Sequence, residues 1–466
     1  MNKNSKWLIF LLLAIAQFMI VLDSSITNVA VASIKQDLHF TESALQWVIT
    51  AYSLAFGGFL LFGGRAADLF GRRRMLLIGM ISFTFFSLMI GLSHSALMLI
   101  VLRALQGLAA ALMSPAALSI VLVTFGEGPE RNKALAYWTL VAAGGAAMGL
   151  LLGGFLTQYF GWRWDFFINV PVGILIATAI FKIVPAHEKE ASHSHLDLPG
   201  AILVTAGLIT LVFAFSQAPV WGWLSSGTLG TIGAALVLLA IFILNESKSS
   251  YPLMPLAIFK IRNVTGANLM IAPLYASMMG NFFLTSLYIQ QVMHYSPVIT
   301  GLSFLPFPFI LGFTSTRIPK LVAKFGYKPF LIIGPSLVAI ALLWLSRVPV
   351  EGSYLLNLLP TFILMPIGMG MTFMPIFAAA TSGVKPEESG LASGLINTSQ
   401  QMGGALGLAI LSGVAGSVTA AATNMSKLQA LVTGFDRAFL TAVFFVLFAI
   451  FLAITVIKQK QPQSLL

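Results

Sequence analysis

Fourteen long apolar runs constrain this chain more than any other feature. Each run is close to the ~20 residues that an α-helix needs to cross the hydrocarbon core of a bilayer. We place them at residues 7–32, 45–63, 75–92, 97–121, 134–159, 166–184, 198–217, 228–244, 264–290, 301–316, 330–346, 355–379, 390–417 and 438–457. The chain is 58% hydrophobic and 9% charged, whereas soluble domains carry about 25% charged residues. The sequence therefore predicts an all-α polytopic membrane protein.

The stretch at 64–74, between the second and third runs, sets the expected orientation. It contains Gly64, Arg65, Asp68, Gly71, Arg72, Arg73 and Arg74. Short cytoplasmic loops carry an excess of Lys and Arg, so this stretch is predicted to be a tight cytoplasmic turn. An even number of spans then places both termini in the cytoplasm. Of the 26 Lys and Arg residues, Arg103 falls within a span, and the predicted outer segments hold only Lys35, Arg163, Arg347, Lys427 and Arg437.

A faint internal repeat suggests the domain organisation. Residues 68–73 are echoed by residues 323–328 in a second basic turn, and many transporters are built from related repeats. We predict one six-helix half at 1–184, a linker with an inserted helix pair at 185–262, and a second six-helix half at 263–466. The linker contains His193 and His195. We expect these histidines to be solvated rather than to bind a metal, and no cofactor is predicted.

Two ionisable residues stand out because burying a charge in the membrane costs at least about 2.5–3.5 kcal/mol. Asp23 is the one acid placed well inside a predicted span, and Arg103 is the one basic residue so placed. At a ~1.5 Å rise per residue both lie in the outer half of the bilayer, so they can meet if the first and fourth spans pack together. Burial disfavours a charged carboxylate and a neighbouring cation favours it. Asp23 is therefore predicted to load and release a proton, the alternative being a static structural ion pair.

Several stretches resemble one family. The turn at 64–74 resembles the signature loop of the major facilitator superfamily, and residues 103–107 resemble its motif for proton coupling. Residues 22–30, 162–171 and 386–394 resemble stretches of its fourteen-helix drug:proton antiporters, the Emr/Qac-type multidrug exporters. The fifth span resembles their glycine-rich antiporter motif through Gly145, Gly149, Gly153 and Gly154. This chain departs from the family at two positions: Leu150 replaces the proline of the antiporter motif, and Asp165 stands where an apolar residue is usual.

The resemblance implies a major facilitator fold, two six-helix halves plus two inserted helices, with 14 transmembrane helices. It also implies proton-coupled efflux of lipophilic compounds, cationic ones included, across the cell inner membrane, and hence antibiotic resistance. Asp23 and Arg103 would couple protons, and a latch on the inner face would comprise Gly64, Asp68, Gly71, Arg72 and Arg73. A polar cavity for substrate is expected from residues in several spans, namely Gln17, Asn28, Gln106, Asn281, Gln290, Asn397 and Gln400.

The expected partners are a small-molecule substrate, protons and the lipid bilayer, with the protein acting as a monomer. A periplasmic adaptor protein is left open, and no nucleic acid is expected, because positive-inside loops account for the basic excess. Two other functions remain: a dedicated exporter of one metabolite, such as a siderophore, peptide or amino acid, and a membrane sensor that transports nothing. An enzyme is not expected, since the sequence offers no catalytic constellation or nucleotide-binding loop.

Overall fold

The computed structural model describes residues 3–125, 128–185, 197–384 and 389–459. Within these residues it is helical, and fourteen helices or helix pairs are long and apolar enough to cross a membrane. The fourteen predicted spans are thereby confirmed, although several extend further than predicted; the first, for example, runs to Asp37. The polar linker with His193 and His195, and residues 386–388 of the last family motif, lie outside the described residues.

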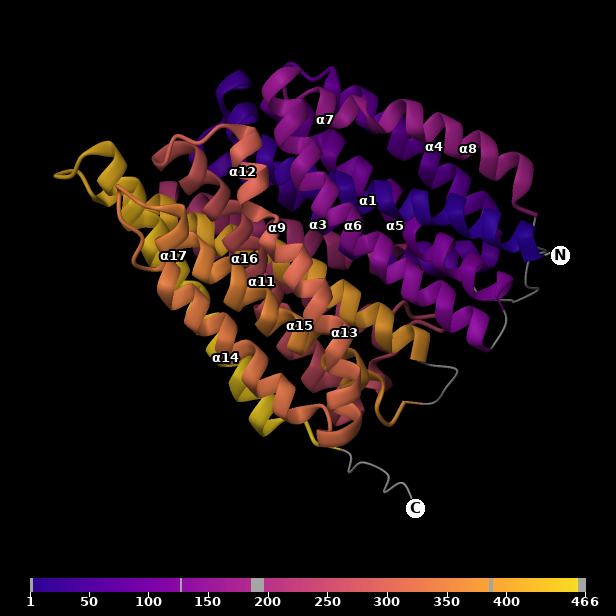
Figure 1. The fold of residues 1–466 in the computed structure, drawn as a ribbon. Coiled ribbons are helices and arrows are strands. Elements are labelled where there is room, and N and C mark those ends of the chain that lie inside the picture. The colour runs from indigo at the N-terminus through magenta and orange to yellow at the C-terminus, as the bar shows by residue number, and fades with distance from the viewer. Residues whose placement is uncertain (1–2, 126–127, 186–196, 385–388, 460–466) are drawn as a thin grey trace.

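The N-terminal half comes first in the chain (Figure 1). It comprises α1 (Lys3–Asp37), α2 (Glu42–Leu45), α3 (Trp47–Phe70), α4 (Arg72–Gly91), α5 (Ala96–Thr124), α6 (Pro129–Tyr159), α7 (Trp164–Phe167) and α8 (Asn169–Ile183). The face that carries the α3–α4 turn at Gly71 is called the inner face below. The opposite face, with the α6–α7 turn at Gly161, is called the outer face.

The inserted pair and the C-terminal half follow. The pair is α9 (Leu198–Trp221) and α10 (Ser226–Lys248), and a 3-10 helix, η1 (Leu256–Lys260), leads into the second half. That half comprises α11 (Arg262–Leu287), η2 (Tyr288–Val292), α12 (Pro297–Phe304), α13 (Pro306–Phe325), α14 (Lys328–Leu345), η3 (Tyr354–Leu358), α15 (Leu359–Thr381), α16 (Ser389–Ala421) and α17 (Lys427–Thr455).

Helix α9 of the inserted pair joins the two halves. It packs against α3 of the first half and α16 of the second, whereas α10 packs against α9. A small apolar cluster fills this junction, with Leu54 from α3, Leu208 from α9 and Ala405 from α16. The indole of Trp47 also donates a hydrogen bond to Ser216 of α9 at 3.1 Å. The inserted pair thus lies beside the seam between the halves.

The halves also meet directly near the outer face. Ser286 of α11 donates to the carbonyl of Asn28 on α1 at 2.8 Å, and the Val298 amide of α12 donates to Gln158 of α6 at 3.2 Å. In Figure 1 the two halves lie side by side near α7 and α12. These contacts place the closed side of the molecule at the outer face.

The α3–α4 turn is shorter than predicted. Helix α3 continues through Gly64 and Asp68 to Phe70, and only Gly71 leaves the helical conformation, with φ of 97°. That backbone angle lies in the left-handed region that favours glycine. The prediction of a loop over 64–74 is therefore wrong in its extent, because residues 64–70 continue the hydrogen bonding of the preceding span.

Candidate functional site: a buried ion pair in the N-terminal half

Asp23 and Arg103 form an ion pair in the core of the N-terminal half. Arg103 Nη1 lies 2.6 Å from Asp23 Oδ2, and the two residues are 1% and 0% exposed, respectively. Asp23 comes from α1 and Arg103 from α5, two helices that pack together. Removing two charges from water is costly unless each gains close and well-oriented partners. The surroundings of the pair supply such partners.

Two amide side chains complete the hydrogen bonding of Asp23. Gln106 of α5 and Asn169 of α8 each donate to Asp23 Oδ1 at 3.0 Å. The oxygen of Gln106 in turn accepts a hydrogen bond from Arg103 Nη1 at 2.7 Å. Both carboxylate oxygens of Asp23 are therefore occupied. Such a network satisfies the polar atoms that the site removes from solvent.

The guanidinium of Arg103 has further contacts with α3 and α7. Its Nε donates to the carbonyl of Val48 at 3.0 Å. The Arg103 Cζ atom lies 4.4 Å from the ring centroid of Tyr52 and 5.6 Å from that of Phe166. Cations are attracted to the faces of aromatic rings at such distances. The arginine side chain is therefore held by the backbone, an aromatic sandwich and the ion pair together.

Two residues of this network, Gln106 and Asn169, were not predicted to belong to it. Gln106 was expected to line a substrate cavity, but it is fully buried between Asp23 and Arg103. Asn169 was noted only as part of the stretch at 162–171. Its position was available from the sequence, since it is an amide within a span, but its partner depends on how α8 packs against α1.

The antiporter-motif glycines allow α6 to approach its neighbours. A Cβ atom at Gly149 would lie 2.7 Å from Ser25 Cβ, and one at Gly153 would lie 2.8 Å from Ile26 Cγ1. Gly145 also faces α1, near Val21, whereas Gly154 faces the Pro297 carbonyl of α12. Small residues permit such close packing of helices in membranes. The glycines thus hold α6 against the helix that carries Asp23 and against the other half.

The predicted latch residues lie at the inner face. Asp68 pairs with Arg72 at 3.4 Å, and the Asp68 side chain is 52% exposed. Arg73 donates to the carbonyl of Phe181 at the end of α8. Arg65 reaches the inserted region, where its Nη2 donates to the carbonyl of Pro252 at 3.1 Å. The inner ends of α3 and α4 therefore contact both their own half and the segment between α10 and α11.

The remaining predicted cavity residues are dispersed. Gln17 accepts a hydrogen bond from Ser114 at 3.2 Å, and Gln290 donates to the Val29 carbonyl across the seam at 3.1 Å. Asn28, at 9% exposure, lies beside the same seam. Asn281 is buried in the C-terminal half, where it donates to Met365 Sδ at 3.4 Å. The others are Asn397, which is exposed, and Gln400, which is half-buried. These residues thus have hydrogen-bond partners in both halves and across the seam between them.

A second acid is buried near the outer face. Asp165 is 0% exposed, although its place just before a predicted span suggested a residue at the membrane surface. The short helix α7 turns inward after Gly161, and this turn carries Asp165 between the helices. Hydropathy could not reveal the burial of Asp165, because the neighbouring Arg163 and Trp164 are polar or interfacial residues typical of the end of a loop.

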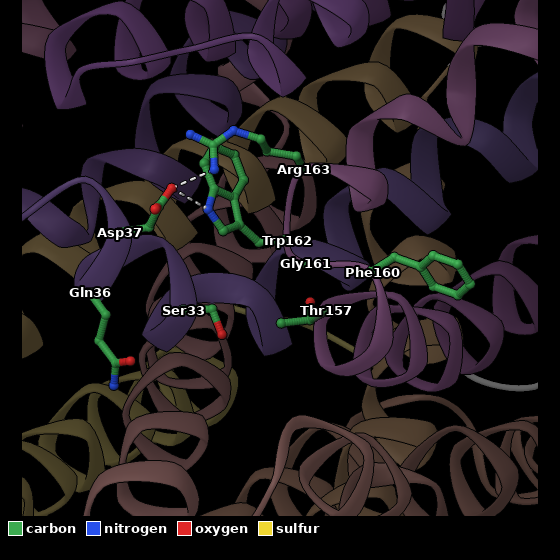
Figure 2. Close-up of a pocket in the computed structure, with 8 residues that line it drawn as sticks. All are labelled: Ser33, Gln36, Asp37, Thr157, Phe160, Gly161, Trp162 and Arg163. Atoms are coloured by element: carbon green, nitrogen blue, oxygen red, sulfur yellow. Dashed lines mark hydrogen bonds and ion pairs between the residues drawn. The ribbon is translucent and has the colours of Figure 1, made fainter.

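A pocket of about 460 Å³ opens beside this acid (Figure 2). It is lined by Ser33, Gln36, Asp37, Thr157, Phe160, Gly161, Trp162 and Arg163. Asp37 accepts hydrogen bonds from Trp162 Nε1 at 3.0 Å and from Arg163 Nη1 at 2.5 Å. The side chain of Asp37 is 44% exposed, so the pocket is in contact with the outer solution.

Comparison with known proteins identifies the family. The sequence model described as Major Facilitator Superfamily matches residues 13–408. The chain is 38% identical over 419 residues to the puromycin resistance protein of Streptomyces alboniger, covering 89% of this chain and 83% of that one. It is 38% identical over 407 residues to the cephamycin export protein of Amycolatopsis lactamdurans, covering 87% and 84% of the two chains. This chain therefore belongs to the Major Facilitator Superfamily, as the sequence motifs predicted.

Solved structures agree on the fold. A bacterial homologue of the human lysosomal transporter Spinster, described as inward-facing and unoccupied, aligns with a TM-score of 0.69 at 16% identity. The alignment covers 98% of each chain. The peptide-transporter-family protein PepTSo also aligns with a TM-score of 0.69, at 15% identity, covering 98% of this chain and 97% of that one. At such identities the likeness concerns the fold alone, and it confirms the predicted major facilitator architecture.

Proposed function

We propose that this protein exports antibiotic-like, lipophilic small molecules across the cytoplasmic membrane in exchange for protons. The observation that carries the proposal is the buried ion pair of Asp23 and Arg103, held by Gln106 and Asn169. The names of the relatives, a puromycin resistance protein and a cephamycin export protein, support the direction and class of transport. Inner and outer face then correspond to cytoplasm and exterior, with both termini cytoplasmic.

In the proposed cycle, protonation of Asp23 is the chemical event. A proton on Asp23 cancels its charge and removes its attraction to Arg103, which then carries a buried charge without its anion. The Tyr52 ring and the Val48 carbonyl hold that arginine in the meantime. Because a buried unpaired charge is costly, protonation favours a different packing of α1, α3 and α5. A change in this packing would be transmitted through α6 to the seam with α12.

The latch on the inner face is proposed to stabilise one of the two arrangements of the halves, those with Asp23 charged and with Asp23 protonated. Arg65 bonds Pro252 in the segment that leads to the second half, while Arg72 and Arg73 bond within the first half. Movement of the halves changes the distance between these two groups of contacts. The role proposed for Gly71 is to allow the sharp turn that such a latch requires, whereas a Cβ atom at Gly64 would make only an ordinary contact with Pro115, at 3.8 Å.

A narrow substrate range is the second candidate. Several relatives are named for a single antibiotic, among them the tetracenomycin C resistance and export protein of Streptomyces glaucescens, 34% identical over 88% of this chain and 76% of that one. A dedicated exporter would use the same proton chemistry but accept one scaffold. The neutral amides expected to line the path, Gln17, Asn397 and Gln400, do not distinguish the two possibilities.

Reconstitution tests the function and the range together. Purified protein in liposomes with an imposed pH gradient should move a fluorescent lipophilic cation against its own gradient, and collapse of the pH gradient should stop it. A panel of unrelated antibiotics added to detergent-solubilised protein should each cause proton release if the range is broad, and only one scaffold should do so if it is narrow. Absence of flux for every compound, with folded protein, would exclude an exporter and favour a membrane sensor.

Orientation is tested separately with single cysteines. The chain has no cysteine of its own, so Arg73→Cys should react with a membrane-impermeant maleimide only from the cytoplasmic side. Ser95→Cys and Ser226→Cys should react only from outside. The same membranes, cross-linked at low protein density, would report the proposed monomer. Copurification with an outer-membrane channel would instead reveal an adaptor-dependent assembly.

A further inference from the structure

Asp165 differs from Asp23 in how its carboxyl group is satisfied. Thr157 Oγ1 donates to Asp165 Oδ2 at 2.6 Å, while Asp165 Oδ1 is buried without a hydrogen-bond partner among the described residues. Asp23, by contrast, accepts from an arginine and two amides. A buried carboxylate with one neutral donor pays most of its desolvation cost uncompensated. The environment of Asp165 therefore favours the neutral, protonated acid.

The charged groups on the surrounding helices do not reverse this preference. Helix α7 packs against α1, α4, α6 and α8. On α1 the ionisable side chains toward the outer face are Asp23, Lys35 and Asp37, and at the outer end of α6 the ionisable side chain is Tyr159. The charged side chains of α4 and α8 lie at the inner end of these helices, namely Arg72, Arg73, Arg74 and Lys182. The two arginines nearest to α7 are already bonded, Arg103 to Asp23 and Arg163 to Asp37 and the Ser93 carbonyl.

A single hydroxyl separates Asp165 from the outer pocket. Thr157 lines the pocket and also donates the hydrogen bond to Asp165. Figure 2 shows the side chains of Thr157 and Ser33 at the lower part of the pocket, with Asp37, Trp162 and Arg163 above them. Water in this pocket would be within reach of a hydroxyl that contacts the buried acid. The pocket therefore provides an approach from the outer solution to Asp165.

Asp165 is also connected to the ion-pair network. It precedes Asn169 by four residues, and the intervening Ile168 keeps a right-handed helical conformation, so both side chains lie on the same face, about 6 Å apart along the axis. Asn169 donates to Asp23 and to Ser87, and Ser87 donates to the Phe166 carbonyl. The two buried acids are thus joined through α7 and the start of α8.

We propose that Asp165 is a second proton-binding carboxyl group, loaded from the outer pocket through Thr157 and occupied by a proton in this outer-closed state. In the loading step a hydronium ion in the pocket gives a proton to Thr157 Oγ1 as that hydroxyl passes its own proton to Asp165 Oδ2. One O–H bond forms at Asp165, one breaks in the hydronium ion, and Thr157 is regenerated. The role of this proton in transport rests on the proposed antiport, but its binding does not.

Infrared spectroscopy of the full-length protein in lipid nanodiscs tests the binding directly. At neutral pH the unmutated protein should show the carbonyl stretch of a buried protonated carboxylic acid. Asp165→Asn, which keeps the acceptor for Thr157, should remove that band and lower by one proton per protein the proton uptake measured when the pH is brought from alkaline to neutral. Asp23→Asn should keep the band. An Asp165→Asn protein with an unchanged band and unchanged proton uptake would overturn the proposal.

Thr157→Val tests the route. It should shift the frequency of the same band, because Thr157 is the hydrogen-bond partner of this carboxyl, and slow proton uptake after an acid jump from the outer side. Thr178→Val is the matched control, since the hydroxyl of Thr178 donates to the Ile174 carbonyl of its own helix. Unchanged frequency and unchanged uptake rate in Thr157→Val would exclude the route. If liposomes that contain the unmutated protein show no proton-driven efflux, the proposed antiport is overturned, but the infrared and proton-uptake results for Asp165 still stand.

Discussion

The two halves of the molecule share an architecture but differ in the chemistry at their centres. In the first half a carboxylate on α1 pairs with an arginine on α5. In the second half Asn281, at a similar distance from the start of α11, forms hydrogen bonds with Met365 and Thr285. An aromatic cluster lies beside it, in which the ring centroids of Phe282 and Phe304 are 5.3 Å apart and those of Phe282 and Phe307 are 4.7 Å apart. Titratable chemistry is thus concentrated at the centre of the first half.

The two basic turns differ in the same way. Both break at a glycine of positive φ, 97° at Gly71 and 75° at Gly326. The first turn places an acid among arginines, whereas the second has lysines and Tyr327, whose hydroxyl bonds the Lys458 carbonyl. The two turns thus share their helix geometry, whereas the pairing of an acid with an arginine is seen in the first turn, and the proposed proton coupling and latch are assigned to the first half for that reason. Four mutations probe this difference.

Asp23→Asn is expected to have the largest effect on transport. The amide keeps the size and polarity of the carboxyl group but cannot carry a proton. Efflux driven by a pH gradient should fall to that of empty liposomes, while substrate still binds, as measured by fluorescence titration. If the mutant retains proton-driven efflux, the first half does not hold the essential proton carrier, and Asp165 becomes the next residue to test.

Arg103→Ala is expected to be the most destabilising change in either half. It leaves Asp23 buried without its counter-charge, and breaking a buried pair in this way costs about 3–5 kcal/mol. The thermal unfolding temperature in detergent should fall accordingly. Combining it with Asp23→Asn should restore much of the stability but none of the proton-driven efflux. A double mutant no more stable than Arg103→Ala would show that the loss comes from packing against Tyr52 and not from charge.

Asp68→Asn should reduce efflux several-fold with little change in expression or substrate binding. Its pair with Arg72 is exposed at the surface, where such pairs contribute about 0–1 kcal/mol, so any large loss of transport reflects the conformational step. Lys324→Gln in the corresponding turn of the second half is the matched control and should transport normally. Equal losses in both variants would mean that the turns act alike and that no latch is specific to the first.

Asn281→Leu should have the smallest effect. It removes one interhelical hydrogen bond, to Met365, and one within α11, from Thr285, and interhelical hydrogen bonds in membranes average about 0.6 kcal/mol. The unfolding temperature should change little, and the ratio of protons to substrate should not change. A changed ratio, measured by the pH gradient that balances a known substrate gradient, would show that the second half takes part in proton coupling after all.

The sequence by itself determined the membrane class, the number of spans and the similar depth of Asp23 and Arg103 in the membrane. These follow from quantities that sum along the chain: apolar length sets where a helix can cross, and residue count from a span end sets the depth of a charge. The family motifs lie within single helices or turns, so they too could be read directly from local sequence.

Only the tertiary structure decided which side chains share an environment. Hydropathy gives the depth of a residue but not the helix that its side chain faces. For that reason Gln106 belongs to the ion pair and not to a cavity, and Asn169 joins the same network. The burial of Asp165 required the turn at Gly161 to direct α7 inward, against α1 and α6. Packing between helices fixes such contacts, and helix packing depends on residues that are distant in the sequence.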